Sequence, residues 1–139
     1  MADTTDPSFV LAQRILDLAY EKKAFSPRIF DVAKLFGYTD FVVILSGRSD
    51  RQVRAIADHV SSTLKTEDKV FPIGIEGEDV GQWVLMDYGD VVVHLFNGPV
   101  REYYELDGLF HDAPALKIPE PAWEAEMRGG AFDHPAYTP

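Results

Sequence analysis

The chain has 139 residues, 46% of them hydrophobic and 26% charged, which is the composition of one globular domain with a sizeable core. Asp and Glu number 23 against 13 Lys and Arg, a formal net charge of −10. This balance argues against a broad nucleic-acid-binding face, because such faces need clustered cations. The absence of cysteine excludes disulfides, thiolate catalysis and cysteine-ligated zinc.

The first residues have neither a basic start nor a long apolar run, so they do not resemble a secretory signal. No apolar stretch reaches the roughly 18 residues of a membrane helix. We therefore expect a cytoplasmic protein that binds neither membranes nor DNA. An acidic protein of this size is suited to a basic protein, a metal ion or a small molecule as its partner.

Three elements are predicted in the first part of the chain. An Asp-Pro pair at residues 6 and 7 is typical of a helix start, and apolar residues at helical spacing extend this helix to about Lys23. Arg28–Val32 is a short strand candidate. Asp40–Ser46 is nearly continuous apolar sequence rich in valine and isoleucine, which suits a strand covered on both faces.

The next segment predicts a helix followed by a strand. Ser49 and Gln52 form a capping box, which opens a helix from about Asp50 to Lys65 with one apolar stripe. Val70–Ile75 is a further short strand candidate.

A hairpin over Gln82–Phe96 is the clearest element. Two apolar runs flank Asp87–Asp90 (DYGD), where Asp and Gly favour a tight reversal. A Gly-Pro pair then opens a last helix over Val100–Leu109. Strands interleaved with helices predict an α/β fold, a mixed sheet of about five strands flanked by helices.

Composition shifts near residue 111. Residues 1–110 predict a single α/β domain, with 18 acids, 11 bases and a net charge of −7. Residues 111–139 hold five of the nine prolines, with five acids, two bases and a net charge of −3. Because proline lacks the backbone donor that helices and sheets use, this part predicts an extended or disordered C-terminal tail.

The turn between the buried strand and the second helix is a candidate phosphate site, formed by Gly47, Arg48, Ser49 and Arg51. Backbone N–H groups at a helix start, a glycine and two arginines suit a phosphate. The other interpretation is structural, with the glycine making the turn and the serine capping the helix. The sequence has neither the P-loop nor the dinucleotide glycine pattern, which favours the structural interpretation.

Signals for catalysis or metal binding are weak. The acidic run at residues 76–79 lies between glycines in an expected loop, and Asp87 and Asp90 bracket a turn where Asp is common. His94 lies in an apolar strand, where a hydrogen-bonded histidine is more common than a catalytic base. No nucleophile-elbow motif accompanies it. We therefore expect no enzyme, no cofactor and no metal.

The hairpin is the best candidate for a docking surface. Strand alternation divides its first half into two sets, Trp83, Leu85 and Asp87 on one face and Val84, Met86 and Tyr88 on the other. A face left bare by helices would present an aromatic anchor beside a carboxylate, and Trp, Tyr and Arg dominate interface hot spots. The other interpretation is that these aromatic residues are core and rim packing.

Several segments of the chain resemble one known family in order and at the expected spacing, from about residue 8 to residue 114. They are Thr39–Ile44, Ser46-Gly47, Ser49–Val53, Gly74–Gly77, Trp83–His94, Arg101–Tyr104, Leu106 and Asp112–Pro114. The family that they resemble is that of the ribosomal silencing factors (Iojap-like, RsfS).

The resemblance implies a small α/β protein with a nucleotidyltransferase-like fold and no established transferase activity. It further implies binding to the large ribosomal subunit through protein number fourteen on the intersubunit face. Such binding sterically blocks joining of the small subunit and represses translation under nutrient limitation. An acidic protein would be steered toward a basic ribosomal protein.

From the resemblance we expect the hairpin residues Trp83, Leu85, Asp87, Tyr88 and Asp90 to supply most of the partner contact. The two aromatic residues would be the anchors, and the acids would pair with lysines or arginines. Two alternatives remain open. One is a nucleotide- or phosphate-binding enzyme of nucleotidyltransferase type that uses the candidate phosphate turn, and the other is a homodimer that buries the same hairpin face.

Overall fold

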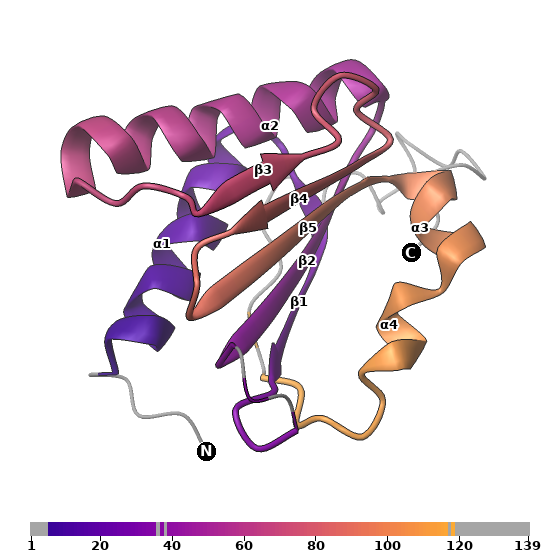
Figure 1. Ribbon diagram of the computed structural model, residues 1–139. Coiled ribbons are helices and arrows are strands. Elements are labelled where there is room, and N and C mark those ends of the chain that lie inside the picture. The colour runs from indigo at the N-terminus through magenta and orange to yellow at the C-terminus, as the bar shows by residue number, and fades with distance from the viewer. Residues whose placement is uncertain (1–5, 36, 38, 117, 119–139) are drawn as a thin grey trace.

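The computed structural model describes residues 6–35, 37, 39–116 and 118 (Figure 1). Its elements in chain order are α1 (Pro7–Glu21), β1 (Phe25–Asp31), β2 (Phe41–Gly47), α2 (Asp50–Thr63), η1 (Leu64–Asp68), β3 (Gly74–Glu76), β4 (Trp83–Asp87), β5 (Val91–Asn97), α3 (Gly98–Tyr104) and α4 (Leu106–Leu109). The element η1 is one turn of π-helix that continues α2.

The five strands form one mixed sheet in the order β1-β2-β5-β4-β3. The central pair β2 and β5 is parallel, and the other neighbouring pairs are antiparallel. Every residue of β2 is buried, as expected for a strand covered on both faces. The predicted α/β class and five-stranded mixed sheet are confirmed, whereas the nucleotidyltransferase-like label stays a prediction.

Two long helices, α1 and α2, cover one face of the sheet, which we call the helical face (Figure 1). Apolar side chains of both helices meet alternate residues of the strands in one large core. Members of this core include Ile15, Leu18, Ile56, Val60, Val43, Leu45, Val84, Met86 and Val93.

The other face of the sheet carries a second, smaller core. Its buried residues are Phe30, Val32, Val42, Ile44, Phe96, Phe110 and Ala113, with Val100 packed against them. They lie on or directly after β1, on β2 and β5, and on the segment that follows α4, while β4 contributes none of them. We call this side the open face, because it is covered only in part.

Local sequence signals explain where the two long helices begin. The Asp6 side chain accepts a hydrogen bond from the Ser8 backbone N–H at 2.9 Å and caps α1, as the Asp-Pro pair predicts. Ser49 caps α2 by accepting from the Gln52 N–H at 3.1 Å. A Cβ on Gly47 would lie 2.8 Å from Cγ2 of Val53, so the glycine lets α2 approach β2 closely.

Two predicted elements are shorter than expected or divided. The predicted helix over Val100–Leu109 is two short helices, because Glu105 adopts a left-handed conformation with φ of 50° and ends α3. The predicted strand over Val70–Ile75 reduces to the three residues of β3. Lys69 is also left-handed and Pro72 lacks an N–H, so pairing with β4 begins near Ile73, whose N–H donates to the Asp87 carbonyl at 2.7 Å.

Packing continues beyond residue 110. Ala115 forms an isolated bridge with Phe30, and the Leu116 N–H donates to the Ile29 carbonyl at 2.9 Å. Residues 113–116 therefore lie along the outer edge of β1. The remaining tail, 119–139, lies outside the described residues, so the division into domain and tail stays a prediction.

Candidate docking surface

The hairpin β4–β5 presents its alternate residues to the open face. The antiparallel register places Trp83 opposite Phe96 and Leu85 opposite His94. The predicted set of Trp83, Leu85 and Asp87 is thus on one face, and Trp83 is 36% exposed while the other two are partly buried. These residues lie where no long helix covers the sheet.

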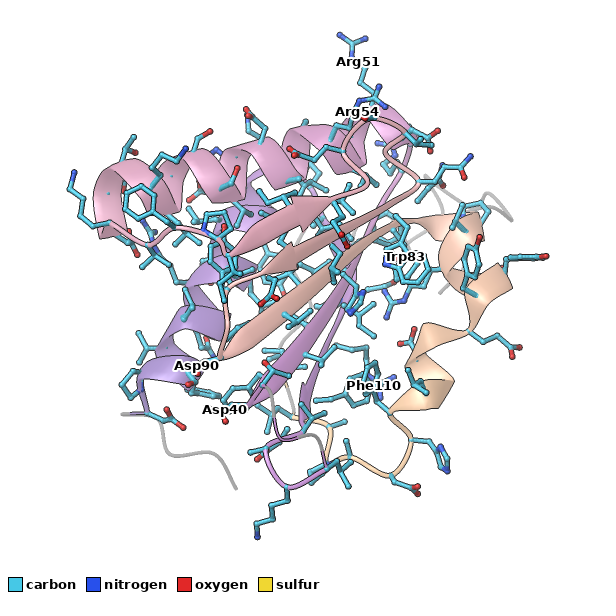
Figure 2. The ribbon with its side chains drawn as sticks, viewed as in Figure 1. Asp40, Arg51, Arg54, Trp83, Asp90 and Phe110 are labelled. Atoms are coloured by element: carbon cyan, nitrogen blue, oxygen red, sulfur yellow. The ribbon has the colours of Figure 1, made fainter. Side chains whose placement is uncertain are left out.

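Trp83 is the centre of an aromatic cluster, which we define as Trp83, His94, Phe96, Tyr103 and Tyr104. Its ring centroid lies 5.0 Å from that of Phe96 and 5.2 Å from that of Tyr104. Figure 2 shows Trp83 between the sheet and α3. These neighbouring rings hold the indole in place, although Trp83 stays partly exposed to solvent.

His94 fixes the orientation of the indole. The Trp83 Nε1–H donates to Nδ1 of His94 at 3.0 Å. Because an indole N–H can only donate, Nδ1 of His94 must be unprotonated, so the ring is neutral with its proton on Nε2. Burial disfavours the charged form and lowers the pKa of His94 from 6.5 to about 4.

Tyr88 does not join this cluster. It lies on the helical face, where it is 9% exposed and belongs to the large core. Burial raises its pKa to about 12, and among the described residues its hydroxyl has no hydrogen-bond partner. The structure therefore leaves a single aromatic anchor, Trp83, on the predicted strand.

The two hairpin acids lie away from Trp83. Asp87 accepts from the Gly89 N–H at 2.8 Å and so supports the turn. Asp90 is exposed at the end of the sheet opposite to Arg51 and Arg54 (Figure 2). Trp83 starts β4 and Asp90 follows its end, so the length of the strand separates them.

Helix α3 adds aromatic surface that the sequence reasoning did not assign. Tyr103 is 81% exposed and Tyr104 is 54% exposed, and their rings meet edge to face at 5.1 Å. Glu102 and Glu105, their neighbours in the chain, are also exposed. The signal that was available is the Arg101–Tyr104 motif of the resemblance, which carries no role by itself.

The candidate phosphate turn is brought together but is occupied by the chain itself. Arg48, Ser49, Arg51, Gln52 and Ala55 line a shallow depression at the start of α2. The Arg48 N–H donates to the Gln52 side chain at 2.7 Å, and the Gln52 N–H donates to Ser49. Backbone donors that a phosphate would use are therefore engaged in capping.

No metal site and no membrane span emerge from the described part of the chain. Within those residues no group of three or more His, Asp and Glu is placed to hold a metal ion. None of the helices described is both long and apolar enough to cross a bilayer.

Comparison with known proteins gives a consistent result. The model of the family described as "Ribosomal silencing factor during starvation" matches residues 5–136. A ribosomal silencing factor RsfS from Halalkalibacterium halodurans is 36% identical over 110 residues, which is 76% of this chain and 93% of that protein. Another from Chromobacterium violaceum is 42% identical over 80 residues, covering 58% of this chain and 65%, just under two thirds, of that protein.

The fold has a solved counterpart. A crystal structure of a protein from Chromobacterium violaceum matches with a TM-score of 0.71 at 33% identity, covering 81% of this chain and 90% of that one. Sequence and fold thus resemble the same group of proteins.

Proposed function

This chain belongs to the family of ribosomal silencing factors, and from that premise we propose that it represses translation by docking on the large ribosomal subunit. The docked protein blocks joining of the small subunit, and the partner is the basic large-subunit protein number fourteen at the intersubunit face. The mechanism is steric, so it requires no catalytic residue.

The observation that carries this proposal is the uncovered aromatic cluster on the open face. A tryptophan held by stacking and by a hydrogen bond to His94, yet 36% exposed, has the properties of an interface hot spot. Leu85, on the same strand and face, extends the apolar contact area.

Charge supports a basic partner. The chain carries a net charge of −10, and the hairpin itself contributes Asp87, which ends β4, and Asp90, which precedes β5. Complementary charge speeds association and selects the partner. In the proposed contact Trp83 and Leu85 are the apolar contacts and the two acids pair with lysines or arginines of the ribosomal protein.

Sedimentation with purified ribosomal subunits tests the proposal. The protein is expected to co-sediment with free large subunits, to bind isolated protein number fourteen, and to lower the yield of joined ribosomes when it is added before small subunits. If the protein binds neither large subunits nor isolated protein number fourteen, the proposal is refuted.

Two further measurements address the alternatives. Mass measured across concentration detects a homodimer, which would compete for the same face. Calorimetry with Mg²⁺ and nucleoside triphosphates detects nucleotide binding, and micromolar affinity would favour the enzyme alternative.

A further inference from the structure

We propose that the docking surface extends from the hairpin onto α3, and that Arg101 is the positioning residue that holds α3 in place for the partner. This inference rests on the proposed function and adds to it a surface and a residue. The occupant of the extended surface is the same basic protein of the large subunit.

Helix α3 has little apolar anchoring of its own. It is seven residues long and none of its residues is fully buried. Val100 is its contact with the smaller core, and the exposed Tyr103 and Tyr104 add only the contact of Tyr104 with the partly exposed Trp83. A short helix with so little buried surface is not stable alone, so polar contacts must fix its position.

Arg101 supplies those contacts. Its guanidinium donates to both carboxylate oxygens of Asp107, at 3.0 and 2.8 Å, and to the hydroxyl of Ser46 at 2.9 Å. It also donates to the backbone carbonyl of Ser26. One side chain, 11% exposed, therefore ties α3 to α4, β1 and β2.

We call the hydrogen bonds of Arg101 to Asp107, Ser46 and Ser26 the Arg101 clamp. It is possible because the helix is interrupted at Glu105. Around a continuous helix, residues 101 and 107 would point about 120° apart. The left-handed Glu105, with its N–H donating to the Arg101 carbonyl at 3.0 Å, turns the chain so that Asp107 returns to the guanidinium. Burial raises the pKa of Asp107, but the bonds to Arg101 outweigh it and leave the pKa below its usual value.

The extended surface is continuous with the hairpin and suits a basic partner. Tyr104 lies 5.2 Å from Trp83 between ring centroids, so the aromatic cluster bridges both elements. Glu102 and Glu105 are exposed, while the one cation in Gly98–Leu109, Arg101, faces inward. Exposed tyrosines flanked by acids are typical of a surface that receives Lys and Arg side chains.

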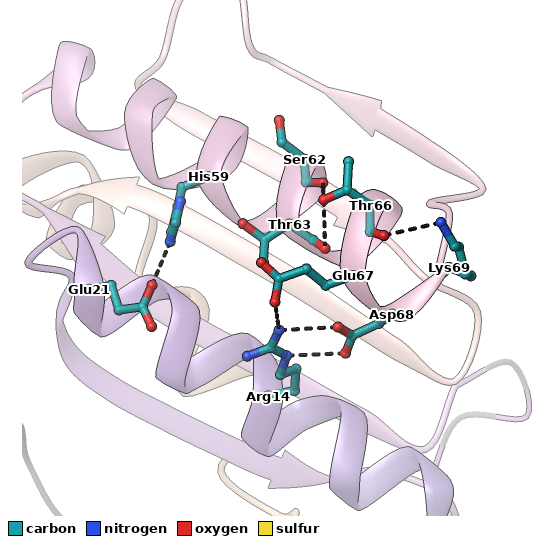
Figure 3. Close-up of polar contacts among 9 residues, drawn as sticks. All are labelled: Arg14, Glu21, His59, Ser62, Thr63, Thr66, Glu67, Asp68 and Lys69. Atoms are coloured by element: carbon teal, nitrogen blue, oxygen red, sulfur yellow. Dashed lines mark hydrogen bonds and ion pairs between the residues drawn. The ribbon is translucent and has the colours of Figure 1, made fainter.

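The test compares Arg101 with a matched ion pair elsewhere. Arg14 on α1 donates to Asp68 at 3.1 Å through Nε and to Glu67 at 3.0 Å, joining α1 to η1 (Figure 3). Like Arg101, Arg14 links two elements through several hydrogen bonds, but it lies on the helical face of the sheet. Arg14→Ala is therefore the control for Arg101→Ala.

We expect Arg101→Ala to weaken binding to large subunits by about tenfold or more, and Arg101→Lys by less, because lysine keeps the charge but cannot form the bidentate pair. Amide hydrogen exchange should rise over Gly98–Leu109 and stay unchanged in β2 and β5. Arg14→Ala should leave the affinity unchanged. This local exchange pattern separates positioning from a general loss of stability.

Tyr103→Ala and Tyr104→Ala test the surface and leave the Arg101 hydrogen bonds in place, since both side chains are exposed; Tyr103→Ala is the cleaner test, because Tyr104 also contacts Trp83. Each is expected to weaken binding by about fivefold or more. If wild-type protein binds large subunits and the two tyrosine variants bind equally well, the extension is wrong while the proposed function stands. If the tyrosine variants lose affinity but folded Arg101→Lys and Arg101→Ala do not, the positioning role is wrong. Absence of wild-type binding would instead refute the proposed function.

Discussion

The two faces of the sheet differ in how they are covered. On the helical face, α1 and α2 bury alternate residues of all the long strands in one apolar core. On the open face, the smaller core covers β1, β2 and part of β5, and α3 is held mainly by the polar clamp of Arg101. Trp83 and His94 are left at the boundary between covered and uncovered sheet.

This difference indicates that the two faces of the sheet have different roles. The free energy of folding comes chiefly from burial of apolar area, so the helical face supplies most of the stability. A surface that carries an exposed indole and two exposed tyrosines contributes less to folding and is free to bind. Substitutions on the two faces should therefore affect different measurements.

The largest effect on stability is expected from Ile56→Ala. Ile56 on α2 is fully buried in the helical-face core, and its truncation should lower the free energy of unfolding by about 3–4 kcal/mol. Urea unfolding followed by circular dichroism measures this loss. At a temperature where the variant is folded, its affinity for large subunits should equal that of the wild type; a selective loss of affinity would contradict these different roles.

His94 should make stability depend on pH. Its pKa is about 4 when folded and about 6.5 when unfolded, so between these values the unfolded chain binds the extra proton. Stability is therefore complete above about pH 6.5 and falls toward pH 4, by up to about 3 kcal/mol. Midpoints of urea unfolding, measured between about pH 4 and pH 6.5, test this dependence of stability on pH.

His94→Gln is the control for that pH dependence, because the amide still accepts from the Trp83 indole but does not titrate. The other histidines, His59 and His111 among them, are present in both proteins. The difference between the two curves thus isolates His94. If the two curves are parallel, burial does not shift the pKa of His94.

Trp83→Ala should weaken binding to large subunits by about 2 kcal/mol, with a smaller change in stability because the side chain is 36% exposed. Phe71→Ala is the matched control: Phe71 is 61% exposed and lies between η1 and β3. Equal losses of affinity in both variants would indicate a nonspecific apolar effect and contradict a specific anchor at Trp83.

Tyr88→Phe should have the smallest effect and the opposite sign. Removal of a buried hydroxyl that has no partner among the described residues should stabilise the fold by about 1 kcal/mol. Binding should not change, because the ring is on the helical face. If Tyr88→Phe folds normally but binds large subunits more weakly, Tyr88 is part of the docking surface.

Sequence patterning predicted the sheet well because its signals are local. The continuous apolar run of β2, the DYGD turn and the alternation along β4 each follow from strand geometry, and they correctly grouped Trp83 with Leu85 and Asp87. Alternation cannot tell which group is uncovered, since that depends on where the helices pack. The expectation of Tyr88 as a second anchor rests on the family resemblance, whereas the alternation places it on the other face, where it joins the large core.

The clamp at Arg101 had no sequence signal. Its partner Asp107 is six residues away, a spacing that no regular helix brings together, and the turn between them depends on a left-handed glutamate where glycine or asparagine would be typical. Similarly, β3 is shorter than its apolar run because Lys69 and Pro72 control the backbone there.

Radical footprinting of the protein bound to large subunits tests where the partner docks, because aromatic side chains report their own solvent exposure. Labelling of Trp83, Tyr103 and Tyr104 should fall on binding, while labelling of Phe71 should stay constant. Protection of Phe71 with unchanged labelling of the aromatic cluster would contradict the proposed docking surface, since the partner would then dock away from the open face.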